Sequence, residues 1–137
     1  MTAPGERGTV TVFVISMTTA LLLVAGLVFD GGRMIAARRE ADAVAAAAAR
    51  AGAQGLDEAG LRQSDGAPLN ASDVVRRVES YLGRTDYSGG ASVSGDTVTV
   101  EVHRTQTLAI LSLAGLASSD ITGTGSARAV RAVGETP

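Results

Sequence analysis

The stretch TVTVFVISMTTALLLVAGLV, residues 9–28, decides the fold of this 137-residue chain. It contains no ionisable group, and its polar side chains are four threonines and one serine. The hydrocarbon core of a bilayer is about 30 Å thick, and a helix of roughly 20 apolar residues spans it. Threonine and serine hydroxyls cost little in such a helix, because they can bond to carbonyls of the preceding turn. We therefore predict a transmembrane segment over residues 9–29.

Two other interpretations of this stretch stay open. A cleaved secretory signal has a shorter apolar region, of about 7 to 15 residues, and ends at a small-x-small site. The nearest such site, Ile35-Ala36-Ala37, lies in a helix-forming run. A buried helix of a soluble protein needs other chain around it, and this short sequence offers little to cover it.

The sequence after this stretch, RMIAARREADAVAAAAARAG, is charged and rich in alanine over residues 33–52. Alanine and arginine are good helix formers, so we predict one helix from about residue 9 to residue 52. Its first half suits lipid, and its second half suits water or other protein. Gly31 and Gly32 follow Asp30 at the predicted membrane exit, and a glycine pair there predicts a helix bend.

Small side chains recur along the second half of this helix. Ala41, Ala45, Ala48 and Gly52 make a smooth stripe, and small residues at such spacing let two backbones approach closely. The plainer interpretation is a good helix former that is simply repeated. Because a helix of this length needs tertiary contact, we predict that Ala41, Ala45 and Ala48 form a packing stripe.

Glycine and proline punctuate residues 54–69, which predicts a loop, with a short helical turn near residues 57–62 as an alternative. A short helix follows, with Asn70 or Ser72 as its cap and Gly83 at its end. Its apolar face is predicted by the spacing of four residues: Val74, Val75, Val78 and Leu82.

A strand is predicted over residues 92–105, where valines alternate with polar residues in the period of a half-buried strand. These valines are Val98, Val100 and Val102. Ser94-Gly95-Asp96 predicts a hairpin turn to a short strand at about residues 91–94.

A final strand is predicted over residues 120–133, after an apolar segment at 108–116 that suits a short helix or a loop covering the sheet edge. One face of the strand is almost without side chains: Ile121, Gly123, Gly125, Ala127 and Ala129. We expect this smooth face to pack on the packing stripe of the long helix. The predicted fold class is α+β, with a long N-terminal transmembrane-plus-soluble helix packed on a small antiparallel sheet.

Composition excludes several classes of function. The formal net charge of −2 gives no basic field for nucleic acid. Cysteine is absent, and His103 is the single histidine, so a zinc centre lacks ligands. No calcium spacing, phosphate loop or nucleophile elbow is present. We therefore predict that the protein is not an enzyme, with no catalytic, cofactor-binding or metal residues and no small-molecule substrate.

The N-terminal block resembles that of TadE/TadG-like proteins, which are associated with the Tad (tight adherence, Flp) branch of type IV pili. Arg7-Gly8 precedes the apolar stretch, Gly26-Leu27 and Asp30-Gly31-Gly32-Arg33 close it, and an alanine-rich helix follows. The resemblance covers about the first 53 residues, and the closing ITGTGSARAV is also similar. The glycine, alanine and arginine content is similar to that of actinobacterial members.

The resemblance implies a pilin-like, single-pass membrane protein of the cell surface, acting in pilus assembly, adhesion or secretion. Its implied parts are a head at 1–8, a transmembrane segment at 9–29, an extracytoplasmic helical continuation at 30–53 and a small extracytoplasmic domain at 54–137. The implied partners are membrane lipid and other pilins or assembly proteins. Counting flanking arginines alone favours the opposite orientation, and we follow the resemblance.

Pilin processing is the point at which the sequence departs from the pilin pattern. Type IV pilins are cut after a glycine and carry glutamate at the fifth mature position. If Gly8 is the processing site and Thr9 the first residue, the fifth position holds Phe13. The missing carboxylate favours a minor pilin-like role over that of the repeating subunit.

The residues expected to face the membrane include Val12, Leu21, Leu22 and Leu23. The alternative function is a membrane-anchored binding or sensor domain that does not enter a filament.

Overall fold

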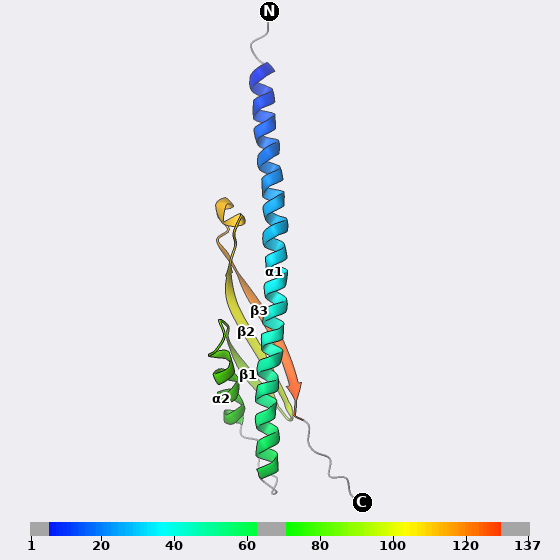
Figure 1. Cartoon of the computed structure of the whole chain (residues 1–137), viewed down its shortest axis with the longest axis vertical. Helices are drawn as coiled ribbons and strands as arrows, with labels where there is room; N and C mark the ends of the chain where they lie inside the picture. The colour runs from blue at the N-terminus through cyan, green and yellow to red at the C-terminus, as the bar shows by residue number, and fades with distance from the viewer. Residues whose placement is uncertain (1–5, 63–70, 130–137) are drawn as a thin grey trace, which may run out of the picture. The chain divides into compact units, whose positions relative to one another are not determined.

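The fold is α+β, as predicted from the sequence: a long N-terminal helix and a small three-stranded antiparallel sheet (Figure 1). A computed structural model of the chain describes residues 6–62 and 71–129. Its elements, in chain order, are the helices α1 (Glu6–Arg62) and α2 (Ala71–Leu82), the strands β1 (Ser88–Ser94) and β2 (Thr97–Thr107), the 3-10 helix η1 (Leu111–Ala114) and the strand β3 (Ser118–Arg128).

Helix α1 is longer than the sequence predicted, because it begins at Glu6 and continues to Arg62. The part of the expected loop at residues 54–62 is therefore helix, and residues 63–70 lie outside the described part of the chain. A glycine in a helix costs only about 1 kcal/mol relative to alanine. A β-carbon on Gly52 would lie 3.0 Å from the Val78 side chain, so this glycine sits directly against α2. The contact between Gly52 and α2 offsets the cost of the glycine. The positions of glycine and proline in the sequence alone could not reveal this contact.

The chain divides into two compact units. The first comprises Met1–Ile35 and Gln106–Ser119, and the second comprises Ala36–Thr105 and Asp120–Pro137. Helix α1 passes through Gly31 and Gly32 as continuous α-helix, and the bend expected at this pair stays a prediction.

The core of the second unit lies among α1, α2 and the sheet. Helix α2 buries three of the four residues of its predicted face, Val74, Val78 and Leu82, while Val75 is only half-buried. Val74 and Val78 lie against α1 at Gly52. Strand β2 contributes the alternating valines to the same core, and each is fully buried: Val98, Val100 and Val102. Asn70, one of the two expected caps of α2, lies outside the described residues.

The β1–β2 hairpin has the expected turn but a longer first strand. Gly95 has φ +61°, which suits the first central position of a two-residue turn. The antiparallel register continues from Ser94↔Thr97 back to Ser88↔His103. The start of β1 was missed because the residues at 88–90, Ser-Gly-Gly, carry no alternating apolar pattern.

Strand β3 occupies the edge of the sheet next to β2 and begins at Ser118, two residues before the predicted start. Its burial alternates as predicted, with Ile121 and Gly123 buried and Thr122 and Thr124 exposed. The end of the strand is tied to the hairpin turn, because the Ala129 amide donates to the Asp96 carbonyl at 2.8 Å. The remainder of the predicted strand, residues 130–133, lies outside the described chain.

Candidate functional site

The apolar half of α1 is a bare hydrophobic surface. All its large apolar side chains between Val10 and Phe29 are about half exposed or more, from 48% at Leu23 to 71% at Val28. The residues expected to face the membrane are among them: Val12, Phe13, Leu21, Leu22 and Leu23. Within the described chain, α1 is the one helix long and apolar enough to cross a membrane, judged by length and composition. Residues 6–62 and 71–129 leave almost all of this stretch uncovered, which favours a membrane helix over the buried helix of a soluble domain.

The second half of α1 presents a face of small residues that is completely buried. Ala41, Ala45 and Ala48 have no exposed surface. A β-carbon on Gly123 of β3 would lie 2.7 Å from the Ala41 β-carbon and 2.6 Å from the Asp42 amide nitrogen. The β3 strand therefore lies directly on the backbone of the helix, and we call this contact the small-residue seam.

A polar bond accompanies the small-residue seam. The Thr124 amide of β3 donates to the Asp42 carboxylate at 3.1 Å. An edge strand leaves backbone amides that point away from the sheet, and these amides can pair with another chain. Asp42 satisfies one of them from α1, so the seam is fixed in register as well as in distance.

In the first unit, α1 holds the chain between β2 and β3 through a single carboxylate. Asp30 accepts backbone hydrogen bonds from Ala109, Ile110 and Leu111 at 3.0, 2.9 and 2.8 Å. Ile110 is the N-cap of η1 and supplies no side-chain cap of its own. Asp30 takes that role from a position about 80 residues away in sequence, and its side chain is only 1% exposed.

One helical turn before Asp30, Gly26 forms the seat for the same segment. A β-carbon on Gly26 would lie 2.5 Å from Cγ2 of Ile110, so the isoleucine side chain rests against the bare helix backbone. Sequence reasoning noted Gly26 as part of a resemblance and Asp30 also at the predicted membrane exit, and it did not connect them to residues 109–111. Their spacing of four residues, on one helix face, was the available signal.

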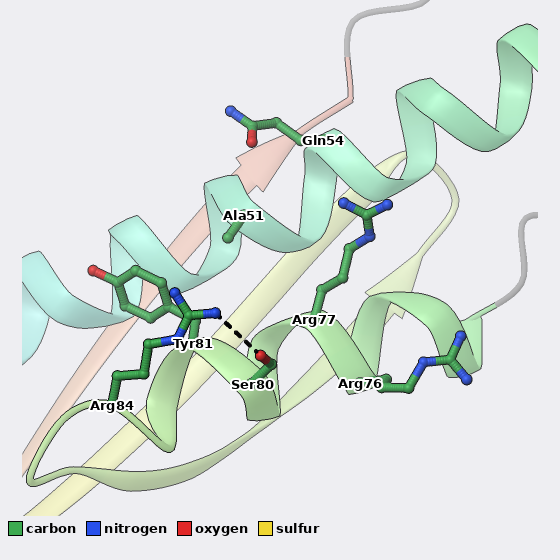
Figure 2. Close-up of a pocket in the computed structure, with 7 residues that line it drawn as sticks. All are labelled: Ala51, Gln54, Arg76, Arg77, Ser80, Tyr81 and Arg84. Atoms are coloured by element: carbon green, nitrogen blue, oxygen red, sulfur yellow. Dashed lines mark hydrogen bonds between the residues drawn. The ribbon is translucent and has the colours of Figure 1, made fainter.

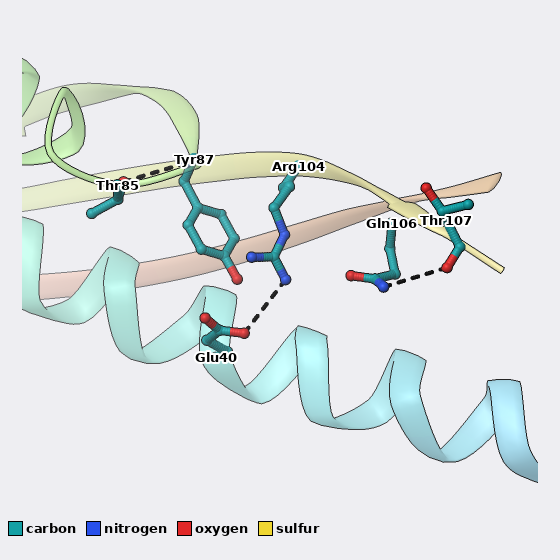
Figure 3. Close-up of polar contacts among 6 residues, drawn as sticks. All are labelled: Glu40, Thr85, Tyr87, Arg104, Gln106 and Thr107. Carbon is teal, nitrogen blue, oxygen red and sulfur yellow. Dashed lines mark hydrogen bonds and ion pairs between the residues drawn. The ribbon is translucent and has the colours of Figure 1, made fainter. Parts of the chain in front are cut away.

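A charged group bridges the sheet and the helix in the second unit (Figure 3). The Arg104 guanidinium carbon lies 4.5 Å from the centroid of the Tyr87 ring, and its Nη2 lies 3.4 Å from the Glu40 carboxylate. Within the described residues the Tyr87 hydroxyl is buried and has no partner at hydrogen-bond geometry, although the Glu40 carboxylate lies nearby. Burial raises the pKa of Tyr87 above its ordinary value, while the nearby Arg104 charge opposes that shift. This group fixes the sheet to α1 and carries no evident chemistry.

A shallow hollow of about 410 Å³ lies between α1 and α2 (Figure 2). Its lining includes Arg76 and Arg77 of α2, Arg84 just after the end of α2, and Gln54 of α1. Arg76 pairs with Asp73, and Arg84 donates to Ser80 at 3.4 Å. Because its lining residues include three arginines and no acidic side chain, the hollow is a basic surface suited to contact with an acidic group.

The predicted processing residues lie near the start of α1. Gly8 and Thr9 both lie in the first turns of α1, and a β-carbon on Gly8 would meet nothing within 4 Å. Among residues 6–62 and 71–129, no group of three or more His, Cys, Asp or Glu side chains could hold a metal ion. His103 is exposed on β2.

Comparison with known proteins gives a match for the segment that contains the apolar half of α1. No curated protein and no solved structure matches the chain. Residues 8–55 match the family model Tad, which is described as putative Flp pilus-assembly TadE/G-like. The matched residues contain the exposed apolar stretch, the Gly26 and Asp30 pair and the alanine face of the small-residue seam. The resemblance noted in the sequence is confirmed over residues 8–55, which are similar to the Tad domain of TadE/G-like Flp pilus-assembly proteins.

Proposed function

We propose that this protein is a minor pilin-like structural or assembly component of a Tad-type type IV pilus. The observation that carries the proposal is the bare apolar surface of α1 inside the segment that matches the pilus-assembly family. An exposed apolar surface of this length is unstable in water and marks contact with lipid or protein. Pilus components use both contacts, first in the membrane and then in a helical bundle.

The proposed arrangement follows the parts expected from the sequence. Residues 9–29 cross the membrane after a short head at 1–8, and residues 30–53 continue the helix outside the cytoplasm. The domain at 54–137 is extracytoplasmic and makes contacts with other pilins or assembly proteins. A helix rise of 1.5 Å per residue gives the apolar stretch a length of about 30 Å, which matches the hydrocarbon core of a bilayer.

Mechanism in this proposal means packing. The small-residue seam supports it, because Gly123 lets β3 rest on the helix backbone at Ala41 and Asp42 fixes its register. Close backbone contact is stiff, since no side chain can rearrange within it. When α1 is drawn into a bundle of helices, the sheet moves with the part of the helix that it contacts.

The minor role is the finer part of the proposal. If processing occurs after Gly8, the fifth residue of the mature chain is Phe13, where pilins carry a glutamate. That glutamate offsets the charge of a neighbour's terminal amine in an apolar bundle, where an unpaired charge is costly. A subunit at the tip of the filament, at its start or retained in the membrane does not need this glutamate, because it does not repeat along the bundle. We infer one of these positions for this chain.

A second candidate function is a membrane-anchored binding or sensor domain that never enters a filament. The basic hollow favours it, because Arg76, Arg77 and Arg84 surround a concave surface next to α1. Clusters of arginine commonly recognise acidic groups. Neighbouring genes for a secretion ATPase and polytopic assembly proteins would favour the pilus function, whereas an isolated gene or a neighbouring kinase would favour the sensor.

The direct experiment is to shear pili from cells that express the tagged full chain and to probe the filament and membrane fractions. The pilus proposal expects the protein in the filament fraction, or in membranes with loss of surface pili when its gene is deleted. A chain that stays in membranes and whose deletion leaves piliation unchanged would contradict the proposal and favour the sensor. The Gly8→Leu variant tests processing separately, since it removes the glycine before the expected cut.

A further inference from the structure

We propose that residues 108–117 form a second membrane contact, which α1 holds against the end of its apolar stretch. In this proposal Leu113 and Leu116 insert into the boundary between acyl chains and headgroups of the bilayer. The inference rests on the membrane placement of α1 in the proposed function. All the contacts that support it lie within the first compact unit of the chain.

The first step is the exposure of the segment. Leu113 is 89% exposed and Leu116 is 58% exposed. The surrounding sequence at 107–119, TLAILSLAGLASS, contains no ionisable side chain. Two exposed leucines in an uncharged segment make an apolar surface that water disfavours, and nothing in the described chain covers it.

The second step is the place of attachment. Asp30 and Gly26, which bind the segment through Ala109, Ile110 and Leu111, lie at the end of the apolar stretch. The exposed side chains of Leu27 and Val28 belong to the same part of α1. The segment is therefore attached to α1 at the level where the helix surface that is proposed to lie in lipid ends.

The third step is backbone satisfaction, which non-helical chain needs wherever it approaches hydrocarbon. The Leu108 amide donates to the Ala117 carbonyl at 3.0 Å, and the Leu116 amide donates to the Leu111 carbonyl at 3.1 Å. The Gly115 amide donates to the Ser112 carbonyl at 3.1 Å. The segment is closed on itself and can present its leucines without exposing these amides.

The fourth step concerns Asp30 itself. A carboxylate next to a bilayer is unfavourable unless polar groups surround it. Three backbone amides surround this one, so the segment shields the charge at the point where the apolar stretch ends. Shielding the carboxylate and inserting the leucines are two consequences of the same attachment.

The composition of the segment decides between lipid and a protein partner. Protein interfaces are enriched in aromatic residues, methionine and arginine, and residues 107–119 contain none of them. Aliphatic side chains with no charge suit an acyl environment better. We therefore assign lipid as the occupant of this surface, and a second copy of the chain becomes an outcome of the test.

The test uses the absence of tryptophan from the chain. Single-tryptophan variants of the full chain, Leu113→Trp, Phe13→Trp and His103→Trp, are reconstituted in phosphatidylcholine–phosphatidylglycerol vesicles that carry brominated acyl chains. We expect Phe13→Trp and Leu113→Trp to lose about half of their fluorescence or more. His103→Trp, on the exposed face of β2, should lose almost none. Bromine near the headgroup should quench Leu113→Trp better than deep bromine.

The outcomes separate this inference from the proposed function. If Phe13→Trp is quenched while Leu113→Trp behaves like His103→Trp, the second contact is wrong and the membrane helix stands. If neither is quenched, the membrane placement itself fails. If Leu113→Trp is shielded from acrylamide only at high protein density and lipid bromine has no effect, a second copy covers the surface and the lipid assignment is overturned.

A positioning variant tests the role of Asp30. Asp30→Asn replaces one acceptor oxygen by an amide that cannot accept the backbone N–H groups. In the Leu113→Trp background we expect acyl-chain quenching to fall by about half or more, while Phe13→Trp with Asp30→Asn stays quenched. Unchanged quenching of Leu113→Trp would show that Asp30 does not hold the segment at the membrane.

Discussion

A β-carbon added to Gly125 of β3 would lie 2.5 Å from the Cα atom of Ala46 on α1. The nearby Ala45 carbonyl carbon would lie 2.6 Å away. Non-bonded carbon atoms pack at about 3.5 to 4.0 Å, so no side chain fits at this position. Because the opposing atoms belong to the helix backbone, neither can turn aside.

Gly125→Ala should destabilise the full chain by about 3 kcal/mol, at the upper end of the cost of an overpacked core. The strand must move away from the helix, which also weakens the neighbouring bond between Thr124 and Asp42. Urea unfolding in mild detergent, followed by pulse proteolysis, measures the change. Gly90→Ala is the matched control, since a β-carbon there meets nothing within 4 Å. Equal effects of the two substitutions would show that β3 does not rest on the helix.

Ala45→Trp tests the helix side of the small-residue seam. Ala45 is completely buried, and an indole there must separate helix and strand. We expect a loss of several kcal/mol or failure to accumulate in membranes. Ala43→Trp, at an exposed position two residues away, should accumulate normally and change stability by less than about 1 kcal/mol. Normal accumulation and stability of Ala45→Trp would contradict the seam.

Much of this arrangement was predictable because it repeats a simple period. Val98, Val100 and Val102 alternate along one strand, and the smooth face of β3 could be read from Gly123 and Gly125. The extension of α1 past residue 54 was not predictable, since buried glycines in a helix look like a loop until α2 is placed against them.

The sequence indicated only half of the Asp30 attachment, because the spacing of Gly26 and Asp30 marks a helix face but not the segment that binds to it. Its partners are backbone amides about 80 residues away, and amides leave no trace in the identity of their residues. The predicted helix bend, the processing site and the orientation in the membrane concern states that the fold of one chain does not report. These stay predictions, which experiments on cells can test.

Tyr87→Phe should leave stability unchanged or raise it by up to about 1 kcal/mol. Within the described residues the hydroxyl is buried without a partner at hydrogen-bond geometry, although the Glu40 carboxylate lies nearby, and an unsatisfied polar group is costly. The ring stacked with Arg104 is retained in the variant. Urea unfolding at neutral pH measures the difference. A loss above about 1 kcal/mol would show that the hydroxyl makes a bond that stabilises the fold.

The same residue predicts a dependence on alkaline pH. Burial raises the pKa of folded Tyr87 above its ordinary value of 10.0. Above about pH 10 the unfolded chain therefore loses this proton before the folded chain does, and stability falls as the pH rises. Below that pH the contribution is fully present. Unfolding curves from pH 9 to 11 should show a steeper loss for the natural chain than for Tyr87→Phe, and parallel curves would contradict the shift.

Membrane extraction of the full chain tests the central claim, that the apolar half of α1 lies in lipid. The account predicts that the protein stays in the membrane pellet after washing with high salt and with sodium carbonate, and that detergent releases it. Leu22→Arg should weaken insertion, because arginine at the centre of a membrane helix costs about 2.5 to 3.5 kcal/mol, whereas Leu22→Ala should not. Recovery of the natural chain as a freely soluble protein, with Leu22→Arg behaving identically, would contradict the account.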